Sequence, residues 1–187
     1  MVKNFNLTKN KPLSKLCIAK GFSDFHAVFE HIKQLPYGRT INRSDYTQVI
    51  KEDKGTCSTK HAFLKAIAIE NDINDLKLCL GVFKMNSENT PQLKSILETH
   101  GLNYIPEAHC YLKYDNTSID ITFGADSDPE FINDLLYEEL IFPEHIGNYK
   151  VDFHQSFLKS WIKSENLKLS FNELWKIREA CIIKLSE

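Results

Sequence analysis

The chain lacks a long apolar run and an excess of charge of either sign. No stretch approaches the roughly 18 consecutive apolar residues of a membrane helix, so no membrane partner is expected. Met1 to Asn6 lack the apolar core of a signal peptide, which favours a cytoplasmic location. The formal net charge of −2 provides no global field for nucleic acid. Neither nucleic acid nor a membrane is therefore an expected partner, and the composition does not point to a substrate.

Cysteine is also scarce, and its spacing excludes two common uses. The five cysteines are odd in number, and no two of them have the CxxC spacing. A disulfide framework and a CxxC metal or redox motif are therefore not expected. The cysteines are Cys17, Cys57, Cys79, Cys110 and Cys181.

The length bounds the domain organisation. With 187 residues, of which 42% are hydrophobic and 26% charged, the chain can bury one core. We expect a single domain over residues 1–187, in which 1–21 forms a loosely docked N-terminal arm and 125–187 a helical C-terminal portion. The sequence does not indicate the oligomeric state.

One cysteine has an unusual local context. Cys57 follows Gly55 directly after a polar, irregular stretch and stands where the apolar periodicity of a helix begins, with Ala62 and Phe63 among its first apolar residues. The N-terminus of a helix carries partial positive charge and unpaired N–H groups, which favour a thiolate over a thiol. Cys57 is therefore a candidate nucleophile.

Two predicted strands supply a base and an acid. His109 lies in one apolar run and Asp120 in the next, and Asp115-Asn116 between them is typical of a tight hairpin turn. That turn makes Leu112 face Ile119 and places His109 and Asp120 on one face of the sheet as diagonal neighbours. Diagonal pairs lie about 7–8 Å apart, within reach of an imidazole and a carboxylate.

A helix cysteine followed by a histidine and an aspartate on successive strands resembles the transglutaminase-like superfamily of papain-like cysteine enzymes. The resemblance covers roughly residues 54–123 and implies that Cys57 attacks a carbonyl, His109 moves the proton and Asp120 orients the imidazole. Many members have an aromatic residue, often Trp, two positions after the histidine; here it is Tyr111.

The remaining pattern predicts an α+β fold, with an antiparallel sheet packed on the buried cysteine-bearing helix. Ser23 is the expected cap of a helix that stops at Pro36, and a capping box starts at Ser170. The other expected elements are a helix over 57–71, a strand over 75–83, a helix from Thr90-Pro91 to Gly101, a helix starting at Ser127-Asp128-Pro129 and a helix over 149–163.

Substrate contacts are less well indicated. Arg39 and Arg43 lie in the polar stretch 37–46 before Cys57, where they form one wall of a cleft and bind an anionic group, or belong to a solvated connection. Gln48 is a weak candidate for binding an oxyanion.

Zinc is the alternative chemistry for these residues, because Cys57, His61, His109 and Cys110 are all possible ligands. His109 and Cys110 point to opposite sides of a strand, so no metal or other cofactor is expected. Asp115 is an alternative orienting acid, but it lies at the predicted turn.

The predicted function is acyl transfer through a thioester on Cys57. Hydrolysis of a peptide or small amide substrate is the simplest outcome, and transfer to an amine remains open. The alternative is a transglutaminase-like binding or scaffold domain without catalytic activity.

Overall fold

The computed structural model describes residues 2–124 and 130–186, and the described residues form a four-stranded antiparallel sheet with helices on both sides. The predicted α+β fold class is confirmed. The strands are β1 (Lys77–Asn86), β2 (Tyr104–Tyr114), β3 (Thr117–Ile119) and β4 (Leu135–Ile141), in the order β3-β2-β1-β4. The helices are α1 (Pro12–Ala19), α2 (Phe25–Gln34), α3 (Gln48–Glu52), α4 (Cys57–Glu70), α5 (Lys94–Thr99), α6 (Asn148–Ser164) and α7 (Phe171–Lys184), with short 3-10 turns η1 (Pro91–Leu93), η2 (Glu130–Asp134) and η3 (Pro143–Ile146).

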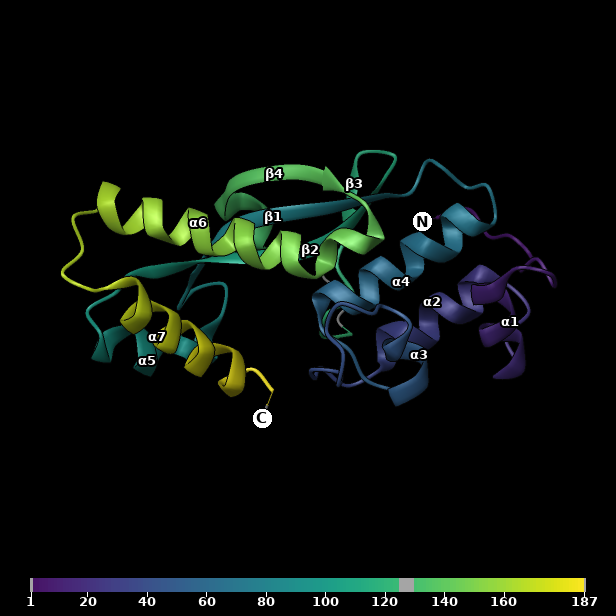
Figure 1. The fold of residues 1–187 in the computed structure, drawn as a ribbon, viewed down its shortest axis with the longest axis horizontal. Helices are drawn as coiled ribbons and strands as arrows, with labels where there is room; N and C mark the ends of the chain where they lie inside the picture. The colour runs from purple at the N-terminus through teal and green to yellow at the C-terminus, as the bar shows by residue number, and fades with distance from the viewer. Residues whose placement is uncertain (1, 125–129, 187) are drawn as a thin grey trace.

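The helices form two groups along the long axis of the molecule (Figure 1). Helices α1, α2 and α3 pack around α4 at one end, whereas α5 and α7 lie at the other end and α6 runs along the sheet. The N-terminus of α4 points toward the middle, between the two groups. Residues from both groups can therefore meet at Cys57.

Each face of the sheet has its own core because successive side chains of a strand point to opposite faces. Leu78 and Leu80 of β1 join the core around α4. Cys79 and Met85 of the same strand join a second core with the apolar side chains of α5, α6 and α7. The central strands β1 and β2 are thus buried between two helical layers.

Helix α4 is buried around nearly its whole circumference, as expected. Every residue from Cys57 to Ala68 is buried, including the polar Lys60 and His61. Such burial fixes the helix and requires partners for its polar side chains. Among the described residues, no helix combines the length and the apolar character needed to span a membrane.

The predicted hairpin is confirmed. Asp115 and Asn116 both have positive φ, at 46° and 61°, the conformation that a two-residue turn requires. Leu112 pairs with Ile119, so the register is the predicted one. Strand β3 ends at Ile119, and Asp120 lies one residue beyond the ladder rather than inside it.

The described part of the expected helical portion over 125–187 is mainly helical, but it also contains a strand that was not expected, β4, which pairs with β1 at the edge of the sheet. Leu136 and Leu140 of β4 are exposed. Because apolar residues here do not mark buried positions, the sequence of this strand shows neither helical nor strand periodicity. The predicted helix start at Ser127-Asp128-Pro129 lies outside the described residues. Helices α6 and α7 are confirmed.

The N-terminal segment 1–21 is not a loosely docked arm. It contains α1, whose first N–H groups, those of Leu13 and Ser14, donate to the Glu70 carboxylate of α4 at 2.8 and 2.7 Å. A carboxylate at a helix N-terminus satisfies unpaired N–H groups and interacts favourably with the helix dipole. The sequence did not reveal this partner because it lies 56 residues away.

Of the two predicted helix caps, the one at Ser170 is confirmed and the one at Ser23 is wrong. Asp24 rather than Ser23 caps α2, since its carboxylate accepts the Ala27 N–H at 3.1 Å. The capping box of α7 is confirmed: Ser170 accepts from the Glu173 N–H, and the Glu173 carboxylate accepts from the Ser170 N–H.

Candidate active site

Cys57 occupies the first position of α4, after Thr56 as N-cap. Thr56 and Thr59 form a capping box, in which the Thr56 N–H donates to Thr59 Oγ1 at 3.0 Å. The box leaves the N–H groups of Cys57 and Ser58 without an acceptor among the described residues. Two free donors thus lie beside the thiol, where a helix N-terminus favours negative charge.

Gly55 explains how the chain enters this helix. A Cβ atom at Gly55 would lie 2.7 Å from the Val49 side chain of α3 and 3.0 Å from Lys60. The Gly55 N–H also donates to Pro36 O at 3.1 Å, and this hydrogen bond joins the loop before Cys57 to the chain just after α2. Only glycine fits this close approach.

His109 and Asp120 form a hydrogen-bonded pair. His109 Nε2 lies 2.9 Å from Asp120 Oδ2, as the hairpin register predicts. Asp120 Oδ1 accepts the backbone N–H of Thr122 at 2.9 Å, which fixes the carboxylate. The His109 ring packs edge-on against Phe131, with centroids 4.7 Å apart. Since Nε2 is occupied by Asp120, Nδ1 is the ring nitrogen left for Cys57.

The structure brings Cys57 to this pair and favours its charged form. Burial alone would raise the pKa of Cys57, but the charges of Lys150 and His109 and a hydrogen bond from His109 lower it to about 6. Burial alone would lower the pKa of His109, but Asp120 and the Cys57 thiolate raise it well above its usual value. A thiolate and an imidazolium therefore coexist at neutral pH.

Lys150 is a member of this group that the sequence did not reveal. It lies in the first turn of α6, 93 residues after Cys57, and its Nζ is 3.7 Å from Cys57 Sγ. The same ammonium donates to Ser58 Oγ at 2.7 Å. No local signal distinguishes this lysine from the others of an amphipathic helix.

His61, one turn along α4, links the two halves of the site. A backbone N–H can only donate, so the 2.9 Å contact from Ile121 N makes His61 Nε2 an acceptor. The proton must then sit on Nδ1, which donates to Cys57 O at 2.7 Å. Burial lowers the pKa of His61 to about 4, so the ring is neutral above that pH. His61 thus connects the start of α4 with the residue after Asp120.

Lys60 makes a similar connection with a buried ammonium. Its Nζ donates to Leu35 O at 2.7 Å and to Thr122 O at 2.9 Å, and it also reaches Lys33 O and Ile121 O within 3.4 Å. It therefore joins the segment after α2 and the segment after β3 to α4. Sequence reasoning gave Lys60 no role, because a helical lysine is usually solvated.

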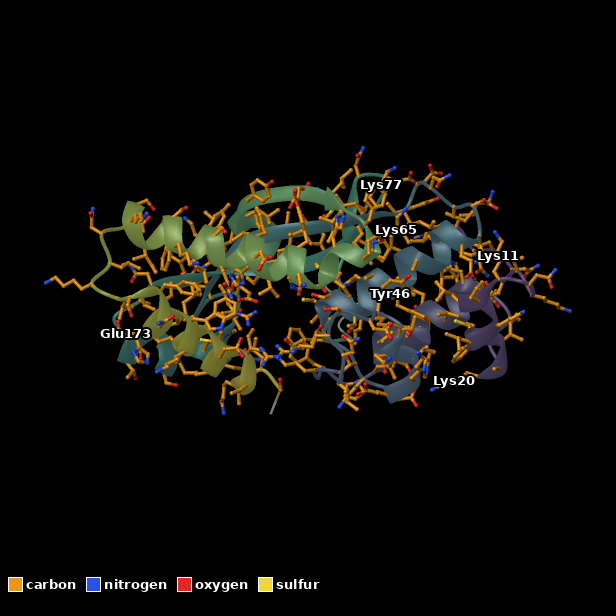
Figure 2. The ribbon with its side chains drawn as sticks, viewed as in Figure 1. Lys11, Lys20, Tyr46, Lys65, Lys77 and Glu173 are labelled. Atoms are coloured by element: carbon orange, nitrogen blue, oxygen red, sulfur yellow. The ribbon has the colours of Figure 1, made fainter. Side chains whose placement is uncertain are left out.

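A pocket of about 390 Å³ opens onto Cys57. Tyr37 and Arg39 line it from the loop before α3, and Lys150, Trp175 and Arg178 line it from α6 and α7. Cys57 itself is only 9% exposed, so a substrate reaches the sulfur through this pocket. Figure 2 shows how the side chains of the two helical groups approach each other near the middle of the molecule, with Tyr46 marking the loop before α3.

The predicted substrate contacts have different surroundings. Arg39 and Arg43 both line the pocket. Arg39 is paired with Glu179 at 2.8 Å, whereas Arg43 is exposed and has no ion-pair or hydrogen-bond partner among the described residues. Gln48 donates to Asp45 Oδ2 at 2.6 Å and is not one of the lining residues. The geometry therefore offers Arg43 to a ligand more readily than Gln48.

A chain of charged side chains lines part of the pocket. Arg178 of α7 binds both carboxylate oxygens of Glu107 on β2, and it also contacts Glu179, which in turn holds Arg39. His154 of α6 lies 3.9 Å from Glu107. Burial alone would raise the pKa of Glu107, but Arg178 and His154 lower it. This chain ties α7 and the loop before α3 to the sheet.

Within residues 2–124 and 130–186, no three His, Cys, Asp or Glu side chains are placed to hold a metal ion. The arrangement instead combines a thiolate, an imidazolium oriented by a carboxylate, and unpaired N–H groups. Together these groups can attack a carbonyl carbon, supply a proton to a leaving group and bind an oxyanion.

Comparisons with known proteins identify no relative. No protein-family model matches the chain, and neither the curated proteins nor the solved structures contain a significant match. The functional argument therefore depends on the geometry of the site.

Proposed function

We propose that this protein catalyses acyl transfer through a thioester on Cys57, and that its reaction is the hydrolysis of a peptide-like amide. The observation that supports this function best is the Cys57–His109–Asp120 arrangement, in which Cys57 lines an open pocket. The proposal places the chain in the transglutaminase-like superfamily of cysteine enzymes.

In the first half of the reaction, the Cys57 thiolate attacks the carbonyl carbon, a sulfur–carbon bond forms, and the carbonyl electron pair moves to oxygen. The tetrahedral species then expels the amine as His109 donates its Nδ1 proton to the leaving nitrogen. In the second half, His109 takes a proton from water, the resulting hydroxide attacks the thioester, and the thiolate leaves. Asp120 holds the imidazole in the orientation that both steps need.

Negative charge on the carbonyl oxygen is met by the N–H groups of Cys57 and Ser58. Neither group has an acceptor within the described part of the chain, and both lie next to the sulfur at the positive end of α4. Preorganised donors of this kind each contribute about 10²–10³ to the rate of acyl transfer.

The substrate is expected to carry an anionic group near the scissile bond. Four cationic side chains line the pocket (Arg39, Arg43, Lys150 and Arg178) against two carboxylates, Glu107 and Glu179, in a chain whose net charge is −2. Because Glu107 and Glu179 neutralise Arg178 and Arg39, Arg43 is the residue proposed to bind that group.

The first test is selective alkylation by iodoacetamide at pH 6, followed by peptide mapping. With a pKa of about 6, half of Cys57 is thiolate, against roughly 0.003 of a thiol with a pKa of about 8.5. The lower nucleophilicity of an acidic thiol removes about tenfold of that advantage, so Cys57 should react about tenfold faster than an ordinary exposed cysteine. The other four cysteines are 0% exposed, against 9% for Cys57, and do not line the pocket, so they should stay unlabelled.

His109→Ala should abolish the low-pH reactivity, and His100→Ala, which changes an exposed histidine outside the pocket, should not. An activated ester of a short peptide should then acylate Cys57 and be turned over. Equal labelling of all cysteines would contradict the activated thiolate. Alkylation without acylation by the ester would favour the binding-domain alternative.

A further inference from the structure

Lys150 is a second cation beside the candidate nucleophile, in addition to His109, and its charge has no carboxylate partner among the described residues. No ion pair within 4.0 Å includes Lys150 among the described residues. The nearest candidate, Glu107, is already bound by both arms of the Arg178 guanidinium. The position of the ammonium is set instead by its 2.7 Å hydrogen bond to Ser58 Oγ.

The ammonium also lies where an oxyanion would form. An oxygen on the carbon bonded to Sγ is one bond farther from the sulfur, so a donor 3.7 Å from Sγ can come within the roughly 2.7–3.1 Å that an oxyanion donor requires. The free N–H groups of Cys57 and Ser58 lie at the same end of α4. Lys150 therefore reaches the reaction centre from α6 and lies at the same end of α4 as these N–H groups.

Negative charge moves from sulfur to oxygen during the attack. Whether Lys150 accelerates the attack depends on which of these two atoms its charge stabilises. A cation that stabilised only the thiolate would lower the energy of the ground state more than that of the transition state, in which charge has begun to leave the sulfur, and would not accelerate the step. An ammonium with three N–H groups can keep its bond to Ser58 and still donate to the new oxyanion.

Resting on the proposed function, we infer that Lys150 is a further catalytic residue, whose ammonium hydrogen-bonds the oxyanion while Cys57 is being acylated. It transfers no proton: the carbonyl electron pair moves to oxygen, the sulfur–carbon bond forms, and the ammonium stays charged. Helix α6 thus adds a charged oxyanion donor to the backbone N–H groups that α4 supplies.

The test compares two reagents on Lys150→Met, with Lys163→Met as the control. Lys163 is an exposed lysine on the same helix and does not line the pocket. Iodoacetamide reacts at a saturated carbon and develops no oxyanion, whereas p-nitrophenyl acetate passes through a tetrahedral oxyanion. Both rates are measured at Cys57 by peptide mapping from pH 5 to 9, and Lys150→Arg serves as a second variant that keeps the charge.

For Lys150→Met we expect the alkylation profile to shift to higher pH, because the charge that lowers the Cys57 pKa is gone. At pH 9 alkylation should return to within about threefold of the wild type, while acylation should stay reduced about 10²-fold. Lys150→Arg should keep the wild-type alkylation profile and recover part of the acylation. Lys163→Met should match the wild type with both reagents.

Equal losses with both reagents at every pH would overturn the inference and leave Lys150 as a residue that only stabilises the thiolate. Unchanged acylation in Lys150→Met would overturn it too. A wild-type protein that is alkylated at pH 6 but never acylated would overturn the proposed function itself, and this result is visible before any variant is made.

Discussion

His61 provides the sharpest test of how the site is held together. In His61→Ala the Ile121 N–H loses its acceptor in a place where Ile121 is buried. The Cys57 carbonyl is not orphaned by the change, because it keeps the helical N–H of residue 61. The orphaned donor costs about 1–3 kcal/mol, and the cavity left by a buried ring raises the total to about 3–5 kcal/mol.

His61→Gln separates these contributions. A glutamine side chain can place its amide oxygen near the position of Nε2 and accept the Ile121 N–H, so most of the ring volume and the important hydrogen bond are kept. We expect it to cost only about 1–2 kcal/mol at pH 7.5.

The pH dependence of the free energy of unfolding provides a second test, because acid should destabilise the wild type more than His61→Gln. The pKa of His61 is about 4 in the folded protein and about 6.5 in the unfolded chain, so the unfolded state binds more protons between these values and stability falls as the pH falls. By pH 5 this linkage costs the wild type about 2 kcal/mol, and His61→Gln is free of it. The stability deficit of His61→Gln should therefore shrink to about zero at pH 5.

The measurement is urea unfolding followed by tryptophan fluorescence at pH 7.5 and pH 5, with His100→Ala as the control histidine. Equal destabilisation by His61→Ala and His61→Gln at both pH values would refute the hydrogen-bond assignment. A His61→Ala protein as stable as the wild type would refute the whole account of this residue.

Two further predictions concern neighbouring charges. Asp120→Asn should slow alkylation of Cys57 at pH 6 at least threefold, because the carboxylate that raises the His109 pKa is lost; an unchanged rate would show that Asp120 does not support the ion pair. Arg178→Met should lower the free energy of unfolding by about 3–5 kcal/mol, because it leaves the Glu107 carboxylate buried without its bidentate partner. In urea unfolding, Glu107→Gln should recover much of this loss in the double variant, and strictly additive effects would contradict the pairing.

Local signals account for the parts of the fold that the sequence predicts. Asp115 and Asn116 specify the hairpin, and the strand period of two then brings His109 and Asp120 to one side of it. Strand β4 is different, because it exists only through pairing with β1: Leu80 faces Glu139, 59 residues away. A short edge strand with exposed leucines has no pattern of its own, so the sequence indicates only a helical portion there.

The candidate site likewise contains residues that the sequence indicates and residues that only the packing of distant elements brings there. Cys57 can be predicted because a glycine, a helix start and a thiol are adjacent in the sequence. Lys150 cannot, because its distance to Cys57 is set by how α6 docks across the sheet, which depends on packing throughout the second core. Lys60 and His61 look like ordinary helical residues until the burial of α4 gives each of them backbone groups to satisfy.

The Lys60 ammonium occupies the kind of oxygen cage in which other proteins hold a potassium ion. Four carbonyl oxygens from two separate segments surround it, as carbonyl rings surround dehydrated cations in ion channels. Here the cation is covalently attached to α4, so dialysis cannot remove it and no concentration of salt in the surroundings governs its occupancy. Lys60 thereby holds the segment next to Asp120 against the helix that carries Cys57, as a bound metal ion does in other proteins.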